Sequence, residues 1–492
     1  MFKTGFDNNK YLQMQSQRIK ERIGEFGGKL YLEFGGKLFD DYHASRVLPG
    51  FEPDSKLQML MQLKDQAEIV IVISASDIEN SKIRGDLGIT YDIDVLRLIS
   101  AFEERGLMVG SVVLTKYIST PKVHAFEQKL DDNGIAHYRH YIIDGYPSNI
   151  SKIVSDEGYG KNDYIETTRS LVVITAPGPG SGKMATCLSQ LYHENKRGIK
   201  AGYAKFETFP IWNIPLKHPV NIAYEAATAD LSDVNMIDPW HLEAYGKTTV
   251  NYNRDVEIFP VLKATFDKIY GECPYKSPTD MGVNMAGNCI FDDEAVKDAA
   301  NQEIIRRYYN ACCANLRGQN KKDEIYTLEL LMNNAGLSSE NRLCTKVAEE
   351  IAQNTDAPAA AIELNNGEII TGKTSELLGC ASSMLLNALK KLGNIDDSVL
   401  LIDPEVIKPI QELKINHLGN NNPRLHTDEV LIALSISAVT DKNAALALEQ
   451  VSKLKNCEMH SSVLLSTVDE NVLKQLGIRV TCTPVTKKKI IY

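Results

Sequence analysis

Apolar and polar positions follow one another between residues 55 and 206 in a pattern that predicts β-strands separated by helices. The predicted strands are short runs dominated by valine, isoleucine and leucine, and longer amphipathic segments stand between them. Because strands this rich in apolar residues are buried on both faces, the pattern indicates a parallel sheet covered by helices on both sides. The predicted strands are Glu68–Ser74, Met108–Thr115, His137–Ile143, Leu171–Thr175 and Ile199–Phe206. The predicted helices are Ser55–Gln66, Asp92–Arg105, Pro121–Asn133 and Lys183–Arg197.

The N-terminal segment predicts a helix over Asn9–Phe26, with its apolar residues on one face. A short sequence echo follows, in which Phe26-Gly-Gly-Lys-Leu30 is repeated as Phe34-Gly-Gly-Lys-Leu38. Two similar arms around a Gly-Gly pair predict a β-hairpin that turns at Gly35-Gly36.

The rest of the chain divides into regions of different pattern. Residues 210–290 are less regular and rich in Asn, Asp, Pro and aromatic side chains, whereas residues 292–353 predict three helices. Strand and helix patterns return near Asp356, where Asn366-Gly367 predicts a hairpin. Further strands are predicted over Ser398–Ile402, Ser462–Ser466 and Arg479–Thr483. We therefore expect an α/β domain over 1–290, a helical subdomain over 291–355 and a second α/β domain over 356–492.

A glycine-rich loop joins the strand that ends near Thr175 to the helix that begins near Lys183, with the sequence Thr175-Ala-Pro-Gly-Pro-Gly-Ser-Gly-Lys183. Glycines let backbone N–H groups crowd around an anion, and the start of a helix adds partial positive charge. A lysine at this point adds a full positive charge for terminal phosphate oxygens. We expect a phosphate group to contact Gly178, Gly180, Ser181, Gly182 and Lys183.

The loop departs from the nucleotide-binding P-loop consensus at two positions. Pro177 stands where the first glycine is expected, and proline has no N–H to donate. Met184 stands where a Ser or Thr would bind Mg²⁺, and Thr186 lies roughly 200° further around the helix. The alternative interpretation is a Gly/Pro turn in an ordinary strand–turn–helix unit.

Other loops are expected at the same edge, because the carboxyl ends of parallel strands lie together. Asp77 and Glu207 each follow a predicted strand and could position a metal ion or act as a base, although acids at such places are often helix caps. The four loops are Ser74–Asp77, Thr115–Pro121, Asp144–Pro147 and Glu207–Pro210.

Two further segments hold candidate residues. Asp40, with a carboxylate, His43, with an imidazole, and Arg46, with a guanidinium, fall close together and could bind an anion or transfer protons. Lys276, Asp280 and Asn284 lie in a polar loop that could contact a substrate. In each segment the alternative is a loop whose polar side chains satisfy its own backbone.

Composition narrows the function classes. The net charge of −10 disfavours nucleic acid or an anionic membrane as a partner. No apolar run reaches the roughly 18 residues that span a bilayer, and the nine cysteines show no metal-binding spacing. These features predict a cytoplasmic protein with reduced thiols.

Three longer strings carry a resemblance to a known family. They are Phe34–Phe51, the loop Ala176–Lys183, and Tyr275–Gly287; Pro423–Glu429 and His460–Thr467 look like further motifs. Over its full length the chain resembles the bacterial family DUF1846, a domain of unknown function. The resemblance implies a multidomain α/β protein and supplies no catalytic residues. Some members of the family carry an ATP-dependent peptidase label, but this sequence has neither His-Glu-x-x-His nor Gly-x-Ser-x-Gly.

The leading hypothesis is a nucleotide- or phosphate-binding enzyme that performs phosphoryl transfer or ATP-dependent ligation, with ATP and Mg²⁺ as possible cofactors. Lys183 would stabilise phosphate charge, and Asp40, Asp77 or Glu207 would supply the acid. One alternative is an enzyme that acts on a small phosphorylated metabolite without a nucleotide. Another is a non-catalytic ligand sensor that forms a homo-oligomer through the helices at 292–353. The sequence leaves open whether His426 and His460 meet.

Overall fold

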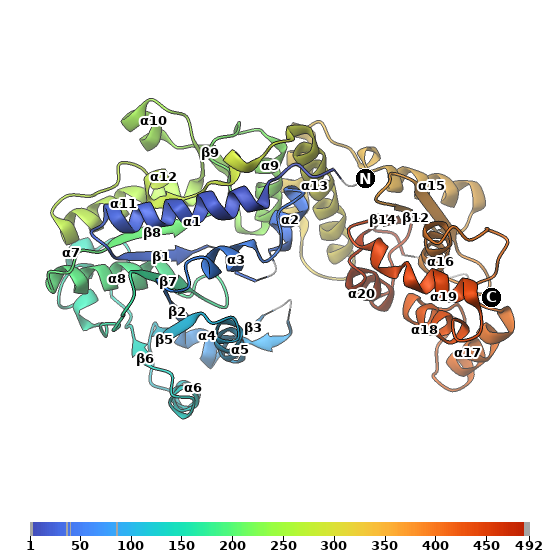
Figure 1. Cartoon of the computed structure of the whole chain (residues 1–492), viewed down its shortest axis with the longest axis horizontal. Coiled ribbons are helices and arrows are strands. Elements are labelled where there is room, and N and C mark those ends of the chain that lie inside the picture. Colours follow the sequence, from blue (N-terminus) through green and yellow to red (C-terminus); the bar gives the residue numbers. More distant parts are fainter. Residues whose placement is uncertain (1–2, 36–37, 40, 85–86, 487–492) are drawn as a thin grey trace. The chain divides into compact units, whose positions relative to one another are not determined.

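The computed structural model describes residues 3–35, 38–39, 41–84 and 87–486. The chain forms two compact units, each with its own sheet and helices (Figure 1). The N-terminal unit comprises residues 4–225 and 232–299, and the C-terminal unit is built mainly from residues 300–492. The fold class is α/β, as the sequence pattern predicts. The boundaries proposed at 290 and 355 stay predictions.

The N-terminal unit is built on a seven-stranded sheet whose neighbouring strands are all parallel. Two of its central strands, Ala67–Ser74 and Leu171–Thr175, are buried along their whole length, as their valine and isoleucine content predicts. In spatial order the strands are β11 (Gly282–Val283), β8 (Gly202–Phe206), β1 (Leu30–Phe34), β7 (Leu171–Thr175), β2 (Ala67–Ser74), β5 (Met108–Thr115) and β6 (His137–Arg139).

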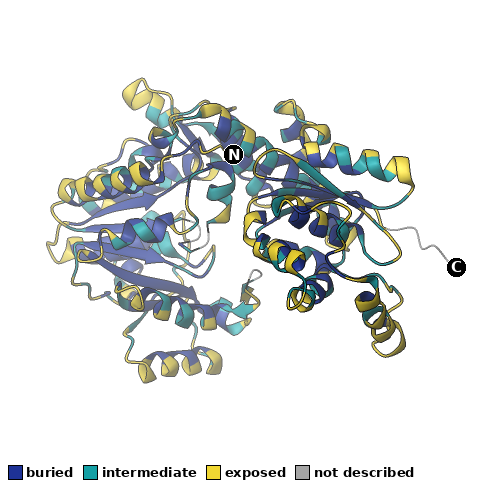
Figure 2. Ribbon diagram, turned by 45° about the vertical axis from the view of Figure 1, so that its right-hand side comes forward, coloured by how far each residue is buried: buried dark blue, intermediate teal, exposed yellow. Residues whose placement is uncertain are grey.

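Helices cover both faces of this sheet. Alternate residues of a strand point to opposite faces, so Val70 and Val72 pack under one set of helices and Ile71 faces the other. Figure 2 shows the strands buried and the outer sides of the helices exposed. The Val70 face packs against α7 (Ile150–Ile153), α8 (Lys183–Lys196) and α11 (Asn253–Tyr270). The helices α1 (Asn8–Glu25), α3 (Ser55–Met61) and α5 (Tyr91–Glu103) bury apolar residues that belong to the opposite side.

The path of the chain creates a switch point beside β7. From β1 the chain proceeds to β2, β5 and β6 in one direction across the sheet, and from β7 it proceeds to β8 and β11 in the other. The helix that follows β7 therefore covers one face of the sheet, and the helix that follows β2 covers the other. In open parallel sheets ligands bind beyond the carboxyl ends of the strands at such a point.

The predicted hairpin at Gly35-Gly36 is wrong. The strand β1 lies inside the parallel sheet, between β7 and β8. The first copy of the echo, Phe26–Leu30, has a different structure. Its Gly27 and Gly28, with φ of 78° and 105°, form the turn after α1. Similar short strings thus end a helix in one place and follow a strand in the other. Gly36 and Lys37 lie outside the described residues.

The irregular pattern between residues 210 and 290 does not predict the 18-residue helix α11 that the structure contains there. Pro260 lies inside this helix, and proline ordinarily argues against a helix interior. The remaining short elements of the N-terminal unit include α2 (Tyr42–Val47), α4 (Ala75–Glu79), α6 (Pro121–Asp132), α9 (Pro219–Ala227), α10 (Pro239–Tyr245), α12 (Pro278–Met281), β3 (Ile83–Arg84), β4 (Ile89–Thr90), β9 (Asn235–Ile237) and β10 (Val250–Tyr252).

The C-terminal unit contains a four-stranded mixed sheet in the order β13-β12-β14-β15. The hairpin predicted at Asn366-Gly367 is confirmed, since β12 (Ala359–Glu363) and β13 (Ile369–Lys373) pair antiparallel around it. β14 (Glu458–Ser461) and β15 (Arg479–Cys482) pair parallel. No strand forms over 398–402, and β14 ends before the strand predicted at 462. The helices are α13 (Asp293–Leu316), which begins in the N-terminal unit, α14 (Lys322–Asn334), α15 (Leu343–Thr355), α16 (Cys380–Leu392), α17 (Pro404–Asn416), α18 (Thr427–Ser437), α19 (Lys442–Glu449) and α20 (Thr467–Gln475).

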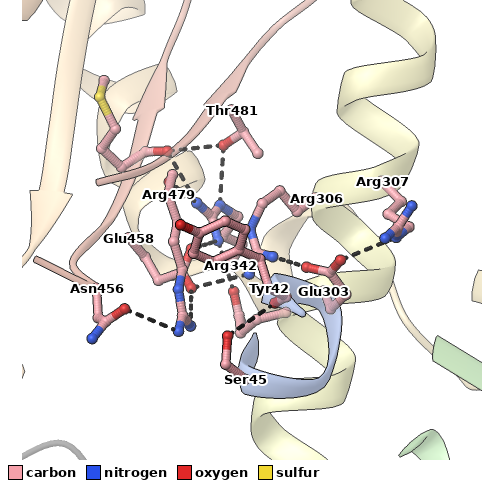
Figure 3. Close-up of polar contacts among 12 residues, drawn as sticks. Tyr42, Ser45, Glu303, Arg306, Arg307, Arg342, Asn456, Glu458, Arg479 and Thr481 are labelled. Atoms are coloured by element: carbon pink, nitrogen blue, oxygen red, sulfur yellow. Dashed lines mark hydrogen bonds and ion pairs between the residues drawn. The ribbon is translucent and has the colours of Figure 1, made fainter. Parts of the chain in front are cut away.

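A buried charge cluster joins helices and strands of the C-terminal unit (Figure 3). Glu458 of β14 accepts from Arg342 at 2.6 Å, from Arg306 at 3.1 Å and from Arg479 at 3.2 Å. Arg342 is 1% exposed and also donates to the Met459 and Arg479 carbonyls. Burial raises the pKa of Glu458, but the three guanidinium groups outweigh it and hold the pKa at about 2. We call Arg306, Arg342, Glu458 and Arg479 the Glu458 cluster.

Among the helices that the structure describes, none has the length and apolar character needed to cross a membrane.

Candidate functional site

The glycine-rich loop after β7 begins helix α8, and its backbone conformation depends on glycine at two positions. Gly180 and Gly182 have φ of 75° and 92°, a region that side-chain-bearing residues rarely adopt. Gly182 is the N-cap of α8 and has no side chain to occupy the first N–H groups of the helix. The start of α8 therefore keeps backbone donors that a capping side chain would otherwise accept from.

Contacts from β5, from the start of α5 and within the loop itself hold this loop in place. Thr115, at the end of β5, donates its hydroxyl to the Ser181 carbonyl at 2.6 Å, and Ser181 donates its own hydroxyl to the Gly178 carbonyl at 2.8 Å. A Cβ on Gly178 would lie 2.3 Å from the Tyr91 hydroxyl oxygen. The loop thus has a shape fixed by specific contacts and by the close approach of Tyr91.

Lys183 is the first residue of α8 and is partly exposed. Among the described residues, its ammonium has no hydrogen-bond or ion-pair partner. Its charge acts on the thiol of Cys187, one turn further along α8, and so does the charge of Glu33 on β1. An unpaired ammonium therefore lies at the positive end of a helix, near a carboxylate on the neighbouring strand.

A second group of charges is buried at the carboxyl end of β8. The Lys205 ammonium contacts the Asp255 carboxylate and the Tyr252 hydroxyl, and its nitrogen lies 2.9 Å from Glu207 Oε1. Each of these charged side chains is at most a tenth exposed. Burial lowers the pKa of Lys205, but Asp255 and Glu207 outweigh it, so that the pKa is well above its usual value.

Within this group, Glu207 has a pKa that lies near neutral pH. Burial raises the pKa of its carboxyl to about 7, with Lys205 opposing the shift and Asp255 adding to it. A carboxyl that titrates near neutral pH can accept and return a proton under physiological conditions, as general acid–base catalysis requires.

Glu33 lies on the strand between the one that precedes the Gly178–Lys183 loop and the one that carries Lys205. On β1 it stands between Ile174 of β7 and Lys205 of β8. Its carboxylate accepts from the Tyr203 hydroxyl at 2.7 Å. Because neighbouring strands lie about 4.8 Å apart, the ends of β7 and β8 are separated by about 10 Å. We call Glu33, Lys183, Lys205, Glu207 and Asp255 the carboxyl-edge site.

The segment that holds Asp40, His43 and Arg46 reaches this region only in part. Asp40 lies outside the described residues. His43 packs its ring edge-on against Phe209, with ring centroids 5.1 Å apart, and Phe209 stacks on Tyr224, which lies near Lys205. Arg46 is in the last turn of α2, while Asp41 caps the start of that helix and pairs with Lys56 at 2.8 Å.

Asp77 is in α4, beside the loop. Its carboxylate lies 3.3 Å from the Lys82 ammonium, and Lys82 lies over the ring of Tyr91, the residue that approaches Gly178. Asp77 is thus brought near the Gly178–Lys183 loop but is paired with a lysine.

The candidate residues Lys276, Asp280 and Asn284 make hydrogen bonds with other parts of the protein. Asn284 donates to the Thr208 and Pro210 carbonyls and so holds the loop that follows Glu207. Asp280 accepts from the Lys276 amide and from the Tyr245 hydroxyl. These contacts are those of a self-satisfied loop, and Asn284 lies nearest to the carboxyl-edge site.

Three members of the site, Glu33, Lys205 and Asp255, escaped prediction. Glu33 and Lys205 are charged residues inside strands that are otherwise apolar, and this is a usable sequence signal because a buried charge needs a partner. Asp255 gave no such signal, since it lies in the region with no clear periodicity.

Known proteins match the chain over nearly its whole length. The description "Domain of unknown function DUF1846, N-terminal" matches residues 4–336, and its C-terminal counterpart matches residues 340–492. A UPF0371 protein of Streptococcus sanguinis is 58% identical over 492 residues, which cover 100% of both chains. UPF0371 proteins of Streptococcus uberis and of Streptococcus pyogenes serotype M5 are 57% and 56% identical over 492 and 487 residues, or 100% and 99% of each chain. The chain therefore belongs to the DUF1846 family, together with these UPF0371 proteins.

Proposed function

We propose that this protein is an enzyme that binds a small phosphorylated metabolite at the Gly178–Lys183 loop and transfers a proton with Glu207. The observation that carries the proposal is the Lys183 ammonium at the start of α8, which has no partner in the part of the chain that the structure describes and lies at the switch point of a parallel sheet. Backbone donors, a helix N-terminus and a free cation together form the arrangement that binds phosphate in many α/β proteins.

The separation of the two charge groups supports a metabolite of limited size. The loop follows β7 and Glu207 follows β8, about 10 Å away across the sheet. A sugar phosphate or a compound of similar length bridges such a distance. Its phosphate would lie against Lys183 and its reacting carbon or oxygen near Glu207.

The buried groups around Glu207 suggest how the proton would move. Ionised Glu207 accepts a proton from the bound substrate and becomes a neutral carboxyl, and Lys205, which keeps its charge, stabilises the carboxylate before transfer and again once the proton has been returned. Burial, with the charge of Asp255 adding to it, keeps the pKa of Glu207 near neutrality, and Asp255 also holds Lys205. Lys183 fixes the substrate through its phosphate and takes no part in proton transfer.

Nucleotide turnover is the second candidate function. A strand followed by a glycine-rich loop and a helix that begins with lysine is also the arrangement that binds nucleotides in P-loop proteins. The residues present do not fit the usual Mg²⁺ arrangement. Met184 replaces the hydroxyl ligand, and Asp77 is paired with Lys82. We therefore favour the nucleotide-independent reaction. Homo-oligomer formation through residues 292–353 stays a separate prediction.

Replacing Lys183 with alanine is expected to weaken phosphate binding by about 1.5–3 kcal/mol, or roughly ten- to a hundredfold, because a charge-assisted contact is lost. Calorimetric titration with inorganic phosphate, ribose 5-phosphate and ATP, with and without Mg²⁺, measures the change. Lys196→Ala is the matched control, since Lys196 is at the other end of α8 and pairs with Asp156. Equal phosphate affinity in both variants would contradict the proposed site, and a strong preference for ATP with Mg²⁺ would favour the second candidate.

The wild-type protein is expected to contain a glutamate carboxyl that titrates near pH 7, because burial raises the pKa of Glu207 from 4.5 to about 7. Carbon NMR of protein labelled at glutamate side chains measures this titration, and Glu207→Gln should remove it. Since the folded pKa exceeds the unfolded one, ionisation of Glu207 also lowers stability as the pH rises from about 4.5 to 7. The variant should lose that part of the pH dependence. A spectrum with every glutamate titrating below pH 5.5 would refute the assignment.

A further inference from the structure

His426, in the C-terminal unit, has one ring nitrogen firmly held and the other available. Its Nδ1 lies 2.9 Å from Oδ2 of Asp469, in the first turn of α20. Asp469 also accepts from the Thr427 amide at 2.9 Å and from the Ser466 hydroxyl at 2.7 Å. These donors fix the carboxylate, and the carboxylate in turn places the hydrogen of neutral His426 on Nδ1. The lone pair therefore lies on Nε2.

The Nε2 atom of His426 has no hydrogen-bond partner among the described residues, and the side chain is 25% exposed. Asp469 is more deeply buried, with 11% of its side chain exposed. This order, with a buried carboxylate behind a partly exposed imidazole, is the arrangement by which enzymes orient a general base.

The second histidine singled out in the sequence behaves differently. Both ring nitrogens of His460 have threonine partners at 2.9 Å, Thr481 and Thr483, and the side chain is fully buried. Burial lowers the pKa of His460, and its contacts are those of a core residue. Of the two motif histidines, only His426 has a nitrogen left for a ligand.

The charges that face His426 come from three helices. Asp469 lies on α20, Glu429 on α18 and Lys414 on α17, and Lys414 is already paired with Glu429 at 2.6 Å. With neutral His426 these groups carry one net negative charge. The surroundings therefore favour a neutral ligand over an anion such as phosphate, and they stabilise an imidazolium once His426 takes up a proton. The hydrogen bond that His426 donates to Asp469 raises the pKa of the imidazole in agreement with this.

We propose that His426 and Asp469 form a second proton-transfer site, which acts on a neutral ligand through its hydroxyl group. The O–H bond of the ligand breaks as an N–H bond forms at Nε2 of His426. The ligand oxygen keeps the electron pair and forms a bond to the carbonyl carbon of an ester, and Asp469 stabilises the imidazolium. The bond from that carbon to the alkoxy oxygen of the ester then breaks, and the proton on Nε2 passes to the departing oxygen, which restores neutral His426. This site is independent of the carboxyl-edge site and of its phosphate ligand.

Hydrolysis of p-nitrophenyl acetate by the full-length chain tests the proposal, with water as the hydroxyl ligand. The second-order rate should rise with pH through the titration of His426, followed by NMR of its ring protons in the same protein. His426→Asn should lower the rate about tenfold or more, within the range of general-base effects. Asparagine is a favoured residue at the N-cap position that His426 occupies before α18, so that the variant keeps its fold.

The controls separate a catalytic from a structural role. His417→Gln removes an exposed histidine of the same unit and should leave the rate unchanged. Asp469→Asn should shift the midpoint of the pH–rate profile downward, because His426 loses the partner that raises its pKa. The proposal is overturned if His426→Asn hydrolyses the ester at the wild-type rate. A wild-type rate that does not follow the titration of His426 would overturn it as well, whatever the variants do.

Discussion

Replacing Lys205 with methionine is expected to lower the free energy of unfolding of the N-terminal unit by about 3–5 kcal/mol at pH 7.5, the usual cost of removing one partner from a buried ion pair. Methionine fills a similar volume but leaves Asp255 and Glu207 buried beside Glu33 without a cation. The three carboxylates would then repel one another in a region from which water is largely excluded.

The effect of Lys205→Met should depend on pH in a definite direction. Lys205 lowers the pKa of Glu207, so without the ammonium this pKa rises further above its value in the unfolded chain. Ionisation then favours unfolding, so the loss of stability grows as the pH rises and shrinks toward pH 5. A loss of equal size at pH 5 and pH 7.5 would mean that Lys205 contributes packing rather than charge.

Tryptophan fluorescence during urea unfolding is suited to this measurement. Both tryptophans of the chain, Trp212 and Trp240, belong to the N-terminal unit, so the signal reports on that unit. Lys263→Met is the matched control, because Lys263 forms an exposed pair with Asp267 on α11. It should change the midpoint little at either pH.

Replacing Glu458 with glutamine is the second change with a large expected effect, about 3–5 kcal/mol lost from the stability of the C-terminal unit. The amide removes the negative charge that Arg306, Arg342 and Arg479 share. Three guanidinium groups would then lie close together, and Arg342, at 1% exposure, has no access to solvent that could screen them.

The loss of stability in Glu458→Gln also shrinks as the pH falls, but over a lower pH range than the loss in Lys205→Met. The pKa of Glu458 is lowered to about 2 from 4.5, so its stabilising contribution is complete above pH 4.5 and is lost as the pH falls toward 2. The difference between wild type and Glu458→Gln should therefore be largest near neutral pH and disappear in strong acid.

Hydrogen exchange of peptides from β14 and β15 measures local stability in the C-terminal unit, while tryptophan fluorescence in the same samples monitors the N-terminal unit. Glu368→Gln provides the control, since Glu368 forms an exposed pair with Lys391 in the same unit. If the two variants exchange alike at neutral pH, the Glu458 cluster contributes nothing to stability beyond its packing.

The sequence predicted the elements whose pattern is local. The valine and isoleucine runs at β2 and β5 predict buried strands because hydrophobic burial depends on the residues themselves, and Asn366-Gly367 predicts a hairpin because its turn geometry suits those two residues. The Gly178–Lys183 loop belongs to the same class. Its glycines and the helix that follows can be recognised from adjacent residues, and the structure adds that it follows a central strand.

Tertiary structure alone decided which distant residues meet. Lys205 and Asp255, or His426 and Asp469, are far apart in sequence, and no periodicity relates them. The same holds for β1, whose flanking glycines suggested a hairpin but whose position between β7 and β8 depends on the burial of both its faces. Secondary structure follows from the spacing of apolar residues along the chain. Paired charges follow from desolvation, because a charge buried by the fold must find its partner wherever the chain brings one.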